Sequence, residues 1–200
     1  MRKYILGEKN SVHLINLEKT IEQIDTAGNF LADLVRKNRK ILFVGCKRQA
    51  QDAIREAAEA TDQYFVNHRW LGGTLTNLQT VRRSVSRMEY LENLSKSPEY
   101  KKMSKKELAS LNRQKNKLQL RLGGIRAMDT PPDAVVIIDS AREYNAVNEA
   151  LKLKIPIVAM VDSNADPDQV QYPIVSNDDA IRSIRVVLSK LIEPAVAAKP

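Results

Sequence analysis

The sequence predicts an α/β protein, a three-layer α/β/α sandwich with a parallel sheet of about five strands and an inserted helical hairpin. Short, continuously apolar segments recur along the chain, which is typical of strands that are buried on both faces. Segments with apolar residues at three- and four-residue spacing separate them, as amphipathic helices do. A strand, a helix and another strand at these distances imply right-handed crossovers between parallel strands.

The N-terminal part begins this alternation. Helical spacing predicts a helix that is capped by Asn16 and ends near Lys37. The apolar run 41–45 predicts a central parallel strand. A helix over 47–60 and a second strand over 62–67 follow.

The C-terminal part continues it, with a strand, a helix and two further strands expected over 134–139, 142–153, 156–162 and 172–175. A final helix follows the last strand. We expect Asn177 to cap that helix, two aspartates to occupy its first turn, and Pro194 with the Ala-rich tail to end it.

Between these parts, the sequence predicts two helices that bury each other as a coiled coil. Apolar residues recur at helical spacing on both limbs, at Leu78, Val81, Val85, Met88, Leu91 and Leu94, and at Leu108, Leu111, Leu118 and Leu122. Pro98 breaks the chain between the limbs, and Ser104 with Glu107 predicts a capping box for the second.

Two Gly-Gly pairs, at 72–73 and 123–124, suit the roots of an insertion between the second and third strands. We therefore expect one sandwich domain, formed by 1–77 together with 123–200, and an inserted hairpin domain, 78–122.

The net charge of +8 is concentrated in this hairpin. Between Arg82 and Arg121 the chain has twelve basic and four acidic residues, so the remainder is formally neutral. A neutral body with one basic arm is the charge layout of a protein that docks on a polyanion, and nucleic acid is the usual partner. The exposed tip is expected to hold Lys96, Lys101, Lys102, Lys105 and Lys106. A merely solvated surface, or one that binds an acidic protein, is the alternative.

Composition excludes several classes of protein. A hydrophobic content of 43% and a charged content of 28% exclude global disorder and fibrous architecture. The single cysteine, Cys46, excludes an intramolecular disulfide and a cysteine-based zinc site, and we expect it to fill space rather than to act as a nucleophile. The N-terminus has neither a signal-peptide core nor a membrane span, so we expect a cytoplasmic protein with no membrane partner.

The segment after the second strand holds the most unusual group of side chains, at the sheet edge where open α/β proteins bind ligands. Arg69 can form paired hydrogen bonds with a phosphate, and both Arg69 and Trp70 can stack on bases. The side-chain amides of Asn67 and Asn77 can form hydrogen bonds with base or ribose edges. In the alternative interpretation, Trp70 plugs the root of the hairpin while Asn67 and His68 satisfy local backbone groups.

The turn after the first strand places Lys47 and Arg48 next to a helix N-terminus, where anions bind. Neither a GxGxxG nor a GxxxxGK[ST] motif occurs, so the sequence does not indicate a nucleotide site. Three arginines of the first limb add to these cations as expected phosphate contacts: Arg82, Arg83 and Arg87.

The best case for an enzyme is a group of aspartates at or after the ends of predicted strands, Asp139, Asp162, Asp166 and Asp168. Such carboxylates can hold Mg²⁺ for phosphoryl chemistry. No nucleophile-and-base pair and no phosphate loop accompany them, and His13 and His68 lack ligand-spaced partners. We expect no catalytic residue, no metal and no cofactor, and keep a Mg²⁺-dependent phosphate-handling enzyme as the alternative.

A long ordered series of motifs runs through the chain, at 4–7, 10, 13–20, 41–45, 47–48, 65–77, 122–125, 132–134, 138–139, 155–156, 161–168 and 177–182. Together they resemble the small-subunit ribosomal protein S2 family of bacteria and organelles over essentially the whole chain. The resemblance implies a flavodoxin-like sheet with an inserted antiparallel coiled coil, bound to small-subunit ribosomal RNA between head and body of the subunit. It also implies contact with ribosomal protein S1 and no catalytic activity.

The chain departs from the family pattern at two places. The family has a His-Phe-Gly-His-like segment before the 4–7 motif, so we expect part of the RNA or partner contact to be missing here. Val175 and Ser176 stand where the family has Pro-Gly, and the course of that loop is expected to differ.

The sequence thus predicts a structural constituent of the small ribosomal subunit, in the cytoplasm or an organelle. Its expected partners are small-subunit ribosomal RNA, ribosomal protein S1 and neighbouring small-subunit proteins, and no small-molecule substrate. The residues expected at the RNA are Lys47, Arg48, Asn67, His68, Arg69, Trp70, Asn77, Arg82, Arg83 and Arg87.

Overall fold

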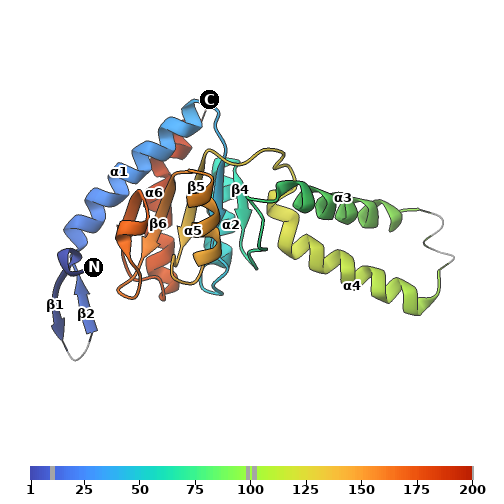
Figure 1. Ribbon diagram of the computed structural model, residues 1–200, viewed down its shortest axis with the longest axis horizontal. Helices are drawn as coiled ribbons and strands as arrows, with labels where there is room; N and C mark the ends of the chain where they lie inside the picture. The colour runs from blue at the N-terminus through green and yellow to red at the C-terminus, as the bar shows by residue number, and fades with distance from the viewer. Residues whose placement is uncertain (10–11, 98–99, 101–102, 200) are drawn as a thin grey trace.

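The computed structural model describes residues 1–9, 12–97, 100 and 103–199. Its strands and α-helices are β1 (Ile5–Lys9), β2 (Val12–Ile15), α1 (Leu17–Arg36), β3 (Ile41–Val44), α2 (Gln51–Thr61), β4 (Tyr64–Val66), α3 (Leu78–Leu94), α4 (Lys105–Leu122), β5 (Ala134–Ile138), α5 (Tyr144–Lys152), β6 (Ile157–Val161), β7 (Tyr172–Val175) and α6 (Ile181–Ala197). Figure 1 shows helices on both faces of the central sheet, with α3 and α4 extending away from it on the side of β4. The hairpin β1–β2 lies at the opposite end of the molecule.

The five strands of the main sheet are all parallel and follow the order β4-β3-β5-β6-β7, which confirms the predicted α/β sandwich. Val44 of β3 pairs with Val66 of β4, and its other neighbour is Ile137 of β5. From β3 the chain continues to β4, which lies on one side of β3 in the sheet. It then returns to β5, which lies on the other side of β3. The boundary between β3 and β5 is therefore the switch point at which open α/β sheets usually bind ligands.

The two faces of the sheet have separate hydrophobic cores because successive strand residues point to opposite faces. Phe43 and Ile138 belong to the core under α1, α2 and α6. Leu42 and Ile137 belong to the core under α5, the loop after β4 and the roots of α3 and α4. The apolar stripe of α3 continues this second core, so the helix pair is anchored to the sheet by hydrophobic contact.

Two helices begin where local sequence signals predict. The Asn16 side chain accepts a hydrogen bond from the Glu18 amide at 3.0 Å and caps α1. Ser104 caps α4, since its hydroxyl accepts a bond from the Glu107 amide at 3.3 Å. Both caps act within one helical turn and need no tertiary contact.

The start of α2 differs from the prediction. The helix begins at Gln51 rather than at residue 47, because the preceding residues form a turn in which the Ala50 amide donates to the Lys47 carbonyl. The Lys47 side chain leaves this turn towards the interior, where it meets carboxylates from distant segments.

The prediction for the start of α6 is also wrong. The Asn177 side chain accepts bonds from the amides of Asp179 and Ala180 and closes a turn before the helix, which begins only at Ile181. Asp178 and Asp179 do not enter the first turn, because their carboxylates bind Lys47.

The helix α6 passes through Pro194 and ends at Ala197, within the Ala-rich tail. Proline removes one backbone hydrogen bond from a helix, which favours ending it there. Here the proline packs against α1 at Gly28, where an added Cβ would come within 3.4 Å of the ring. Tertiary packing between α1 and α6 therefore outweighs the local preference.

The helix pair α3–α4 buries the predicted apolar stripe of α3, at Val81, Val85, Met88 and Leu91. On α4 only Leu122 is fully buried, and Leu108, Leu111 and Leu118 are half-buried. Coiled-coil packing of this pair and the division of the chain into two domains stay predictions. Of the tip lysines, Lys96, Lys105 and Lys106 are exposed, whereas Lys101 and Lys102 lie outside the described residues.

One element has no counterpart in the sequence analysis. Before Asn16 the chain forms the antiparallel hairpin β1–β2, in which Gly7 lies opposite Leu14. In the part of the chain that the structure describes, no helix has the length and apolar character needed to cross a membrane.

Candidate nucleic-acid interface

A shallow groove lies at the root of the helix pair, between α4 and the loop that follows β4. Its lining residues, which we call the root groove, are His68, Arg69, Arg113, Asn116, Lys117, Leu120 and Arg121. Arg113, Lys117 and Arg121 are spaced by four residues and therefore share one face of α4. Among the described residues, no carboxylate lies within ion-pair distance of these three cations or of Arg69.

The three α4 cations belong to the predicted basic arm, but they are not among the residues that we expect at the RNA. A signal was present, since residues 113, 117 and 121 recur at the helical interval. What the sequence does not show is that this face of α4 turns towards His68 and Arg69. Only the packing of α4 against the β4 end of the sheet brings the two segments together.

The three predicted arginines of α3 have different surroundings. Arg82 is bound at 2.6 Å to Asp129 and at 2.7 Å to the Arg126 carbonyl, so its charge is already neutralised. Arg83 is exposed. Arg87 is also exposed and lies over the Tyr90 ring, at 5.1 Å from the centroid.

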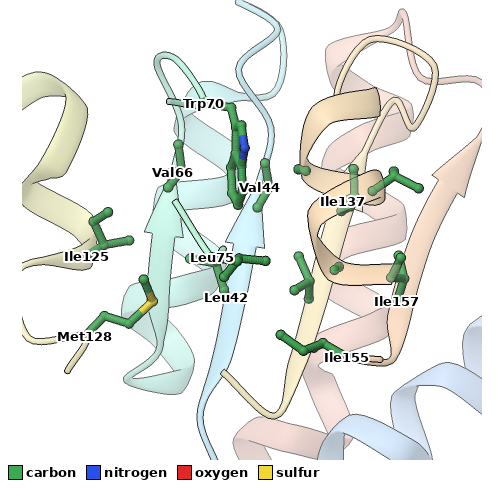
Figure 2. Close-up of a cluster of buried hydrophobic side chains, with 14 of the residues drawn as sticks. Leu42, Val44, Val66, Trp70, Leu75, Ile125, Met128, Ile137, Ile155 and Ile157 are labelled. Atoms are coloured by element: carbon green, nitrogen blue, oxygen red, sulfur yellow. The ribbon is translucent and has the colours of Figure 1, made fainter. Parts of the chain in front are cut away.

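Trp70 is part of the hydrophobic core. It is 8% exposed, and Figure 2 shows it beside Val44 and Val66, near the carboxyl ends of β3 and β4. Its indole nitrogen donates a hydrogen bond to Glu149 of α5. The ring faces protein atoms and is not available to stack on a base, so the geometry agrees with the alternative interpretation of Trp70 as a plug.

The other polar residues of this loop divide into buried and exposed ones. Asn67 is 8% exposed, and its amide group donates to the Gln51 carbonyl at 2.9 Å, which joins the end of β4 to the start of α2. His68 and Arg69 are exposed on the root groove. Asn77 is also exposed, and its side-chain oxygen accepts a bond from the Thr80 hydroxyl.

Lys47 lies at the switch point of the sheet but does not face solvent. Its ammonium group is 3.4 Å from Asp139, 2.6 Å from Asp178 and in contact with Asp179, and the residue is 7% exposed. Burial alone lowers a lysine pKa, but these carboxylates outweigh it and raise the pKa of Lys47 above its usual value. The structure thus gives Lys47 an internal ion-pair role and leaves only Arg48 exposed in this turn.

The four aspartates considered for Mg²⁺ chemistry do not form one group. Asp139 binds Lys47, whereas Asp168 pairs with Lys3 at the surface at 2.9 Å. The Asp166 carboxylate accepts a bond from the Asp168 amide and begins a short 3₁₀ turn. Asp162 instead approaches Asp178 and Asp179, the two residues predicted to occupy the first turn of the last helix.

Cys46 is half-buried next to Glu143. Burial, with the nearby Glu143 carboxylate as a second cause, raises the pKa of the Cys46 thiol to about 12. The thiol therefore stays protonated at neutral pH, which disfavours a role as a nucleophile.

The structure thus combines three features. Internal ion pairs of Lys47 fill the edge of the sheet where ligands usually bind, a helix pair projects from the sheet, and a basic groove lies at the root of that pair. A comparison with protein families finds a match to the family described as Ribosomal protein S2, which spans residues 1–198. Because that match covers nearly the whole chain, this protein belongs to the ribosomal protein S2 family, whose members are structural components of the small ribosomal subunit and serve translation.

Proposed function

We propose that this chain binds small-subunit ribosomal RNA through the root groove, with Arg48, Arg83 and Arg87 as further phosphate contacts. The observation that carries the proposal is the convergence of four cations, from α4 and the β4–α3 loop, on a groove with no acidic residue among its described lining. Like charges held together in this way repel each other, and RNA phosphates supply the counter-charge. Exposed His68 and Leu120 on the same groove offer surface for an unpaired base.

The test is RNA binding by a triple variant, Arg113→Ala, Lys117→Ala and Arg121→Ala. We expect affinity for small-subunit ribosomal RNA to fall, and the slope of log affinity against log salt to decrease by about one for each cation removed. The matched control is Lys37→Ala, Lys152→Ala and Arg182→Ala, which removes the same charge from exposed positions at the end of α1, on α5 and on α6. Filter binding over a salt series and co-sedimentation with small subunits measure both variants.

Equal salt slopes for the two triple variants would count against the root groove as the RNA site. A salt-independent affinity of the unaltered chain would count against RNA binding as such. Replacing Arg82 should matter less than replacing Arg113, because Asp129 already neutralises Arg82.

The finer assignment to a place on the ribosome is also a proposal. We infer that the chain helps to dock ribosomal protein S1 and contacts neighbouring small-subunit proteins, on ribosomes of the cytoplasm or of an organelle. Exposed apolar residues on α1 and α6 support a protein contact, since Leu17, Ile21 and Val186 are 67%, 61% and 63% exposed and line one groove. Ile21→Asp with Val186→Asp should reduce the ribosomal protein S1 retained on small subunits and leave RNA affinity unchanged, and unchanged retention would contradict this role.

We infer further that the chain is not an enzyme. At the switch point of the sheet, where ligands usually bind, Lys47 and its carboxylate partners fill the space with internal ion pairs. The protonated Cys46 thiol beside this point supports the same inference. Phosphatase or nucleotidase turnover that Asp139→Asn abolishes would overturn it.

A further inference from the structure

Three turns at one edge of the sheet expose an arginine each. The carboxyl ends of the parallel strands form this edge, and the turns after β4, β3 and β5 are neighbours along it because the strands are neighbours in the sheet. The turn after β4 exposes Arg69, the turn after β3 exposes Arg48 and the turn after β5 exposes Arg142. In the described part of the chain, none of these arginines has a carboxylate within ion-pair distance. The edge therefore presents three positive charges that the protein itself does not neutralise.

The turn after β5 is basic on its surface although its sequence is not. Residues 139–143 include two acids and one base, so their formal charge is −1. Both acids are buried, Asp139 at 7% and Glu143 at 5% exposure, and Asp139 is paired with Lys47. Arg142 is the charged side chain of this turn that reaches solvent. Folding thus makes a formally acidic segment present a cation.

Hydrogen bonds join the three turns to one another. The Asn67 side chain, after β4, donates to the Gln51 carbonyl at the start of α2, at 2.9 Å. The Cys46 amide, after β3, donates to the Glu143 carboxylate, after β5, at 3.0 Å. Neighbouring strands of a sheet lie about 4.8 Å apart, so the ends of β4 and β5 are about 10 Å from each other. The root groove, which includes the exposed residues after β4, therefore borders the same surface.

An exposed aromatic side chain follows the last of these arginines. Tyr144 is the first residue of α5, two positions after Arg142, and it is 59% exposed. On proteins that bind single-stranded RNA, exposed aromatic rings stack on unpaired bases and cationic side chains contact the phosphates. The segment 142–144 offers both kinds of contact.

The charge of the edge changes sign between β5 and β6. The segments that follow β6 and β7 expose Asp166, Asp168 and Asp179. Neither segment, 162–171 or 176–180, contains a lysine or an arginine. Like charges repel, so this half of the edge disfavours phosphates. The strand order thus sets a boundary between a basic half and an acidic half of one edge.

We infer that RNA bound in the root groove continues along this edge, over the ends of β3 and β5, and leaves it before β6. Arg142 contacts a phosphate there, and Tyr144 stacks on an unpaired base. The inference rests on the RNA binding proposed above and adds to it a direction and two contact residues. Arg48, between the groove and Arg142, lies on this path.

The first test measures affinity for small-subunit ribosomal RNA over a salt series, for Arg142→Ala and for the control Arg182→Ala. Arg182 is exposed on the first turn of α6, which follows the acidic half of the edge. We expect the slope of log affinity against log salt to decrease by about one in Arg142→Ala and to stay unchanged in Arg182→Ala. Both side chains are exposed, and equal urea midpoints verify that both variants fold.

Tyr144 is tested by removing its ring and by keeping it. Tyr144→Ala should weaken RNA binding at least about fivefold with an unchanged salt slope, because stacking is lost and no charge is removed. Tyr144→Phe keeps the ring and should bind like the unaltered chain. Irradiation of the unaltered chain with RNA that contains 4-thiouridine, followed by mass spectrometry, should give adducts at Tyr144 and none over residues 162–169.

An unchanged salt slope in Arg142→Ala, together with a reduced slope in the triple variant of the root groove, would contradict this extension alone. Adducts over residues 162–169 would overturn the boundary between β5 and β6. If Arg142→Ala and Tyr144→Ala kept full RNA affinity but were lost from assembled small subunits, the surface would bind a protein, which also overturns the inference. A salt-independent affinity of the unaltered chain would contradict the proposed function, and this inference with it.

Discussion

The indole nitrogen of Trp70 donates a 3.0 Å hydrogen bond to the Glu149 carboxylate, and this carboxylate organises the whole loop after β4. Glu149 also accepts bonds from the amides of Gly73, Leu75 and Thr76 and from the Thr76 hydroxyl. Gly73 has a φ of +87°, a conformation that side chains rarely allow. One acidic side chain of α5 thus holds both Trp70, in the hydrophobic core under α5, and the loop that leads into α3.

Glu149→Ala should lower the free energy of unfolding by about 2–3 kcal/mol, because it leaves the indole and several backbone amides without an acceptor. Urea denaturation measures the change. Glu59→Ala, at an exposed position of α2, serves as the control and should stay within about 0.5 kcal/mol of the unaltered chain. A change in Glu149→Ala no larger than that of the control would contradict the role of this carboxylate.

The contribution of Glu149 should depend on pH. Burial raises a carboxyl pKa, but the bonds from Trp70 and the loop amides outweigh it and lower the pKa of Glu149. The folded protein therefore binds this proton less readily than the unfolded chain. The stabilisation is fully present above the unfolded pKa of about 4.3 and is lost as pH falls through the folded value.

The measurement is the urea midpoint of the unaltered chain and of Glu149→Gln between pH 3 and pH 7. The difference between the two should be constant at neutral pH and should shrink below about pH 4.3. A difference that grows towards acidic pH would contradict the direction of the shift.

Lys47→Met should destabilise the protein by about 3–5 kcal/mol, because it leaves buried carboxylates without their ammonium partner. Thermal unfolding and urea denaturation both report it. The neighbouring exposed Arg48→Met is the matched control and should have little effect on stability. Similar losses for the two variants would show that the ion pairs of Lys47 contribute nothing specific.

Cys46 should react slowly with thiol reagents in the folded protein. With a pKa of about 12 its thiolate is scarce, so alkylation by iodoacetamide at pH 8 should be at least about a hundredfold slower than in urea. Mass spectrometry over a time course gives both rates. Equal rates in folded and unfolded protein would contradict the raised pKa.

The two glycines at the exit from α4 should respond differently to alanine. A Cβ at Gly124 would clash with the Phe65 carbonyl oxygen, so Gly124→Ala should lower the free energy of unfolding by about 1–3 kcal/mol or more. A Cβ at Gly123 meets nothing within 4 Å, so Gly123→Ala should be neutral or slightly stabilising. Urea denaturation of both variants compares them directly, and equal losses would refute the close approach of the root to β4.

The strands of the sheet could be predicted because their signal is local. Residues 41–44, 134–138 and 157–161 are continuously apolar, and each forms an interior strand that is buried on both faces. The caps at Asn16 and Ser104 could be predicted for the same reason, since a capping side chain and the amide that donates to it lie within one helical turn. The start of α6 could not, because Asp178 is held by Lys47, which lies 131 residues away in sequence.

By itself the sequence determined the α/β class, the concentration of positive charge between Arg82 and Arg121 and the family, because these follow from residue order and composition. Only the tertiary structure decided which cations are free. It buries Lys47 among carboxylates, pairs Arg82 with Asp129 and turns Arg113 towards Arg69. The physical reason is that a charge is neutralised by whatever lies within a few ångströms of it, and for these residues the neighbours come from distant parts of the chain.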